Sequence, residues 1–85
     1  MEKASTFLRT IARGISFNST LASRLELLAK ILDGAFITDS EAVLIGDIVV
    51  LSIDNERDTG YTVMATQIVN LVASFQLLRR EEKFD

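Results

Sequence analysis

The chain has 85 residues, 48% of them apolar, and a formal net charge of −3. These values predict one small folded domain over residues 1–85. Because the sequence contains no His, Cys, Trp or Pro, it excludes disulfide scaffolds, zinc fingers, iron–sulfur sites and catalysis by a thiol or an imidazole.

The first 34 residues have the apolar spacing of two amphipathic helices. In both, apolar residues recur every three or four positions and so share one face. The first set is Ala4, Leu8, Ile11 and Ile15, and the second is Leu21, Leu25, Leu28 and Leu32. Asn18 or Ser19 can cap the second helix, and Asp33-Gly34 can end it in a left-handed conformation. The pattern predicts an αα-hairpin.

A third helix is predicted over about residues 39–53. It begins with a capping box, in which the Thr38 hydroxyl accepts the backbone N–H of Glu41 and the Glu41 carboxylate accepts that of Thr38. The alternative is a β-hairpin at 42–53 with Gly46-Asp47 as its turn, because this segment is rich in β-branched residues. The capping box and the lack of clean alternation favour the helix.

As a helix, residues 39–53 are apolar on almost every side. Ser40, Asp47 and Asp54 recur every seven residues and form a single polar ridge. The large apolar residues near the edges of that ridge are Val43, Val50 and Leu51. We therefore expect this helix to be central in the fold or to be covered by another chain.

The last helix is predicted over about residues 61–78, a run of 18 residues without a charge. Its apolar residues keep a three-four spacing, and they are Tyr61, Met64, Ile68, Leu71, Phe75 and Leu78. Arg79 and Arg80 follow, where cations favour the C-terminal end of a helix dipole.

The acidic segment 54–60 invites comparison with a calcium-binding loop. The position that requires Gly is Thr59, the position that requires a bidentate Glu is Ala65, and Arg57 would repel a cation. We therefore expect neither a metal nor a cofactor.

Together the segments predict an all-α domain of four helices, an N-terminal αα-hairpin followed by two apolar helices, with α+β as the alternative if 42–53 forms a hairpin. So short a chain buries only about 60–65% of its unfolded surface, and this one has more large apolar side chains than such an interior can hold. We therefore expect a homo-oligomer, most simply a dimeric bundle. The residues expected at the self-association surface are Val43, Val50, Leu51, Tyr61, Met64, Ile68, Leu71, Phe75 and Leu78.

The charge pattern favours a protein partner over a nucleic acid. Residues 1–30 carry a net charge of +3 and residues 31–60 a net charge of −6, and an acidic chain lacks the basic face that phosphates require. Asp47 is the best catalytic candidate, but it is better explained as a residue on the solvent-exposed side of its helix. The sequence also has no glycine-rich phosphate loop. We predict a non-enzymatic interaction module, a small bacterial or phage regulator or inhibitor. The expected partner contacts are Arg9, Arg13, Asp47, Asp54, Glu56 and Asp58.

Two alternatives remain open. The first alternative is a small membrane-active protein, because the uncharged run 61–78 approaches the ~20 residues that a membrane-spanning helix needs. Six of these 18 residues are nevertheless polar. A virion assembly component is the other. The first nine residues, MEKASTFLR, lack the apolar core of a secretory signal, so we expect a cytoplasmic protein.

The nine residues EAVLIGDIV, 41–49, resemble a stretch of small enterobacterial biofilm and acid-stress regulators. The resemblance covers about a tenth of the chain. Because those regulators are helical dimers that bind other regulators, it implies a helical dimer with a protein partner. It assigns no role to any single residue.

Overall fold

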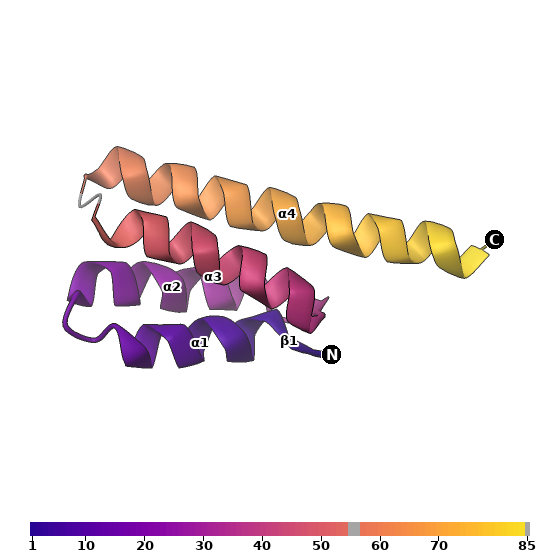
Figure 1. Ribbon diagram of the computed structural model, residues 1–85, viewed down its shortest axis with the longest axis horizontal. Coiled ribbons are helices and arrows are strands. Elements are labelled where there is room, and N and C mark those ends of the chain that lie inside the picture. The colour runs from indigo at the N-terminus through magenta and orange to yellow at the C-terminus, as the bar shows by residue number, and fades with distance from the viewer. Residues whose placement is uncertain (55–56, 85) are drawn as a thin grey trace.

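The structure, a computed structural model, describes the backbone of residues 1–54 and 57–84, and their side chains except those of 58 and 80–84. Within these ranges four helices run alongside one another (Figure 1). The helices are α1 (Ala4–Gly14), α2 (Ser19–Ile31), α3 (Asp39–Ile53) and α4 (Asp58–Phe84), and two short strands are β1 (Glu2–Lys3) and β2 (Phe36–Ile37). The prediction of a small four-helix, all-α domain is confirmed.

The N-terminal hairpin forms as the apolar spacing predicts. α1 packs more extensively on α2 than on any other element. The Asn18 side chain caps α2 by accepting the backbone N–H of Leu21 at 3.1 Å. Gly34, just beyond the end of α2, has a φ of 98°, a conformation that favours glycine.

The strands β1 and β2 join the two ends of the hairpin. They pair antiparallel, with Glu2 opposite Ile37 and Lys3 opposite Phe36. The backbone N–H of Ala4 donates to the carbonyl of Ala35 at 2.9 Å, which satisfies one of the unpaired N–H groups at the start of α1. This pairing places the start of α1 beside the segment that leads into α3.

Residues 39–53 form a helix, so the alternative hairpin at 42–53 is wrong. Both halves of the capping box are present, with Glu41 Oε1 2.7 Å from the Thr38 N and Thr38 Oγ1 3.3 Å from the Glu41 N. Gly46 and Asp47, the proposed turn, lie within α3. The helix accommodates its β-branched residues because the preference of such residues for strands depends on how they pack. Here Ile45 and Val49 pack into the core between the helices.

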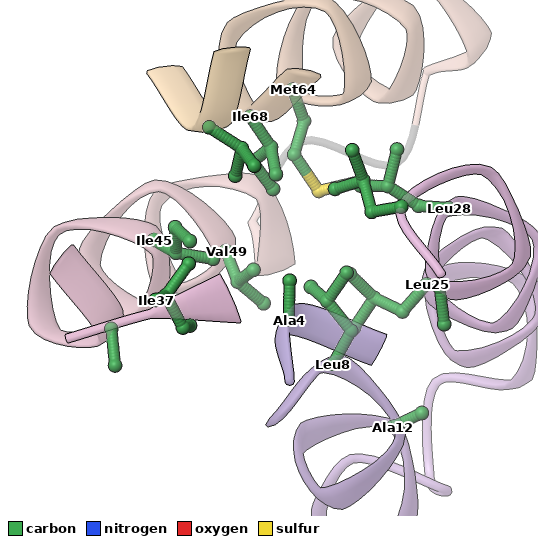
Figure 2. Close-up of a cluster of buried hydrophobic side chains, with 14 of the residues drawn as sticks. Ala4, Leu8, Ala12, Leu25, Leu28, Ile37, Ile45, Val49, Met64 and Ile68 are labelled. Carbon is green, nitrogen blue, oxygen red and sulfur yellow. The ribbon is translucent and has the colours of Figure 1, made fainter. Parts of the chain in front are cut away.

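The core is built by all four helices and β2. Figure 2 shows Leu8 of α1, Leu25 and Leu28 of α2, Ile45 and Val49 of α3, Met64 and Ile68 of α4, and Ile37 of β2 converging on one apolar centre. Small residues such as Ala4 and Ala12 let α1 approach its neighbours closely. The same core fixes which faces of α3 and α4 remain outside.

The molecule is elongated because α4 is longer than the other helices. Its 27 residues span about 40 Å, and the molecule measures 44 × 22 × 20 Å. In Figure 1 the C-terminal end of α4, drawn in yellow, extends past the ends of α1, α2 and α3.

Candidate functional site

The exposed side of α3 carries large apolar side chains on both sides of a polar ridge. Val43 and Val50 lie on one side and Leu44 and Leu51 on the other, and all are exposed, Leu51 to 77%. The ridge, Ser40, Asp47 and Asp54, repeats every seven residues as predicted. All three residues of the ridge are exposed. α3 is therefore apolar both toward the core and toward solvent.

Toward α4, this side of α3 continues into a broad surface that we call the α3/α4 face. It consists of Ile48 and Leu51 of α3 with Val63, Gln67, Asn70, Leu71 and Ser74 of α4. Two shallow depressions of about 460 and 540 Å³ follow it. None of these residues is charged, and Arg57 lies at the end of the face next to the α3–α4 loop.

Toward α1, the other side of α3 borders a depression of about 410 Å³ that we call the α1/α3 groove. Its lining residues are Phe7, Ile11, Ile15, Ala42, Val43, Gly46, Asp47, Val49, Val50 and Ile53. Asp47 is the charged residue among them. The groove follows three turns of α3, with apolar walls and a carboxylate at its rim.

Gly46 lies inside the α1/α3 groove, in the middle of α3. At such a position Gly is about 0.8–1 kcal/mol less favourable than Ala. A Cβ at Gly46 would contact only Phe7 Cζ, at 3.9 Å, which is an ordinary van der Waals distance. Packing within the chain therefore gives no reason for a glycine here.

A partly buried ion pair joins α4, near its C-terminal end, to the start of α3. Arg79 Nη1 lies 2.5 Å from Glu41 Oε1 and 2.7 Å from Oε2, and Arg79 Nη2 donates to the carbonyl of Phe36 in β2. Burial raises the pKa of Glu41, but the Thr38 N–H and the Arg79 guanidinium lower it by more, so its pKa lies below the ordinary value. The pair and the capping box thus hold three segments together, a structural role that the sequence analysis missed.

The residues predicted to contact a partner do not form one cluster. Arg9 pairs weakly with Glu26 of α2, at 3.9 Å, and Arg13 is exposed at the end of α1. Asp47 and Asp54 lie together on the ridge of α3. Glu56 and the side chain of Asp58 lie outside the described residues.

The residues predicted for self-association separate into three groups by their exposure. Tyr61, Met64 and Ile68 are buried in the core of their own chain, so this structure does not present them to a second copy. Leu71 and Phe75 are half-buried, and the exposed members are Val43, Val50, Leu51 and Leu78. Tyr61 also makes a cation–π contact with Arg24 of α2, whose guanidinium carbon lies 5.6 Å from the ring centre.

The described residues include no group of three or more His, Cys, Asp or Glu side chains that could hold a metal ion. The Asp47 carboxylate is exposed. One helix segment in the described part of the chain, Thr59–Arg79, is long and apolar enough to cross a membrane by length and composition, with a mean hydropathy of 1.3.

Comparison with known proteins gives no relative: no family model, no curated protein and no solved structure matches the chain. The resemblance of residues 41–49 to the biofilm and acid-stress regulators therefore has no family match behind it. Any function has to be argued from the surfaces described above.

Proposed function

We propose that the chain is a non-enzymatic protein interaction module, a small bacterial or phage regulator or inhibitor, which works as a homodimer and buries the α3/α4 face between its two copies. The observation that carries the proposal is the exposure of the apolar side chains of α3. Leu51, the most exposed of them, stands on this face.

The exposed apolar side chains of the α3/α4 face support a partner. Leu51 of α3 is 77% exposed and Val63 of α4 is 50% exposed, and both line this face. A second copy that covers the face would remove these side chains from water, which is favourable.

The chemistry of the α3/α4 face favours a second copy over an unrelated protein. A two-fold contact places a patch against itself, so a charge near its centre would meet a like charge. In a chain with 25% charged residues, the depression lined by Ile48, Leu51, Gln67, Asn70, Leu71 and Ser74 has none. Gln67 and Asn70 can both donate and accept hydrogen bonds across such a contact.

Sedimentation equilibrium tests the proposal. We expect the wild type to be a dimer at about 10 µM, and Leu51→Lys to weaken the dimer at least tenfold, because it places two like charges in an apolar contact. The matched control is Leu27→Lys on α2, where the leucine is 56% exposed and lies outside the face. A monomeric wild type, or equal effects of the two substitutions, would contradict the proposal.

A second candidate function, a membrane-active protein, is favoured by the segment Thr59–Arg79, of which only 22% is buried. The exposed side of this segment carries Thr66, Gln67 and Asn70, which suit water or a polar contact better than lipid. Fractionation decides between the two: recovery without detergent in the supernatant supports the interaction module, and recovery in the membrane pellet supports the alternative. A larger ring in sedimentation would instead favour a virion assembly component.

A further inference from the structure

The α1/α3 groove has three properties that the proposed dimer does not use. It is apolar along three turns of α3, it has a glycine in its wall, and its rim carries a carboxylate. It lies on the opposite side of the polar ridge from the α3/α4 face.

The glycine points to an occupant that comes close to the backbone of α3. The positive φ at position 34 favours a glycine there. Gly46 lies within the helix α3, where the backbone conformation does not require a glycine. A Cβ at Gly46 would make an ordinary van der Waals contact with Phe7, at 3.9 Å, and no closer one within the chain, so the packing of this chain does not exclude a side chain here. A small residue at such a position lets another helix approach the backbone closely.

The length of the groove along α3 matches about three turns of a helix. The stretch of α3 that lines it, Ala42–Ile53, rises about 17 Å, which matches about three turns of a bound helix. Phe7 and Ile11 of α1 form the opposite wall. An amphipathic helix would place apolar residues at i, i+3 or i+4, and i+7 between these two walls.

The charge on the rim determines which helix fits. Asp47 and Asp54 are exposed, and no cation pairs with either among the residues that the structure describes. A second copy that placed its own α3 here would bring another Asp47 toward the first, which opposes binding. A helix with lysine or arginine beside its apolar stripe would instead place a cation next to the Asp47 carboxylate.

We propose that the α1/α3 groove binds an amphipathic, basic helix of a partner protein, with the apolar stripe of that helix over Gly46 and a lysine or arginine beside Asp47. The inference rests on the proposed function in one respect, that the chain acts by binding protein. It does not require the dimer.

Two labelled peptides test this assignment by fluorescence anisotropy. Both are helical, about 16 residues long, with leucine at every third or fourth position and alanine between; one carries lysine at the positions flanking the leucines and the other carries glutamate. We expect the lysine peptide to bind the wild type roughly fivefold or more tightly than the glutamate peptide. Asp47→Lys should reverse this preference.

Two further variants separate the groove from the general acidity of the protein. Glu26→Lys makes the same change in net charge on α2 and should leave the preference as in the wild type. Gly46→Leu fills the groove and should weaken both peptides at least tenfold, with its helical circular dichroism unchanged. Equal binding of the two peptides, or the same change in preference for Glu26→Lys and Asp47→Lys, would overturn the assignment.

Sedimentation of the same samples distinguishes failure of this inference from failure of the dimer. If the wild type is monomeric while Gly46→Leu still abolishes peptide binding, the proposed dimer fails and the groove assignment stands. If Gly46→Leu converts a dimer into a monomer, a second copy occupies the groove, and the assignment to a partner helix is wrong.

Discussion

The Glu41 carboxylate and Arg79 together link three parts of the fold. Its Oε1 accepts the N–H of Thr38 at the start of α3, and both oxygens receive Arg79 from α4. Arg79 in turn reaches the Phe36 carbonyl of β2. Because a bidentate, charge-assisted pair of this kind fixes geometry as well as charge, it sets the position of α4 along α3.

The first prediction concerns acid stability. Because its contacts lower the pKa of Glu41 in the folded state, its ionised form stabilises the fold above the unfolded-state pKa, ~4.3. This stability is lost as the pH falls through the folded-state pKa. We expect Glu41→Gln to lower the free energy of unfolding by about 1–3 kcal/mol at pH 7. When the pH is then lowered, the variant should lose less stability than the wild type loses. Urea midpoints measured between pH 7 and pH 3 test both expectations.

The control for this prediction is Glu26→Gln. Glu26 is exposed and meets Arg9 at 3.9 Å, so its replacement should change the free energy of unfolding by less than about 0.5 kcal/mol. A wild type and Glu41→Gln whose urea midpoints fall in parallel with pH would show that Glu41 contributes no acid dependence.

Half of this contact network could be predicted from the sequence. Thr38 and Glu41 are three residues apart, and a capping box is a local pattern. Arg79 is 38 residues from Glu41, and no local pattern connects the two. A clue was nevertheless present: Arg79 follows Tyr61 by 18 residues, which is five helical turns, so both residues had to lie on the same line along α4.

At the scale of elements, the same arithmetic explains which residues of α4 are buried. The predicted stripe keeps a strict seven-residue repeat, but a straight helix drifts by ~20° per heptad relative to that repeat. The buried positions therefore pass from Ile68 to Val72 and then to the half-buried Arg79, while Leu78 is 54% exposed. A strict seven-residue repeat stays on one face only if the helix is supercoiled.

The short strands could not be predicted because two residues have no periodicity. Their pairing depends on the carbonyl of Ala35 and the start of α1 coming together. The hairpin α1–α2, in contrast, was predictable because each helix has its own apolar stripe and Asn18 and Gly34 mark its loops.

The second prediction tests this hairpin with two leucines of α2. Leu25 is fully buried and Leu27 is 56% exposed. We expect Leu25→Ala to cost about 2–5 kcal/mol, through lost burial and the cavity that remains, and Leu27→Ala to cost less than about 0.5 kcal/mol. Urea unfolding followed by circular dichroism measures both, and similar losses would mean that the α2 face is assigned incorrectly.

At the scale of the whole molecule, the stability of so small a domain is linked to its surface. A chain of this length has a marginal core, and here apolar side chains of α3 and α4 remain exposed. Covering the α3/α4 face would therefore stabilise the folded chain as well as join two copies, because anything that binds the folded state alone raises its stability by mass action.

The last prediction follows from this linkage and concerns thermal unfolding. If unfolding and dissociation occur together, the midpoint temperature of the wild type should rise by about 4 °C for each tenfold increase in protein concentration. Leu51→Lys should remove this dependence, since it weakens the α3/α4 contact, whereas Leu27→Lys should retain it. The measurement is a series of reversible thermal scans between about 3 and 300 µM. A wild-type midpoint that stays constant over this range would mean that the domain is stable without a second copy and exposes Leu51 permanently.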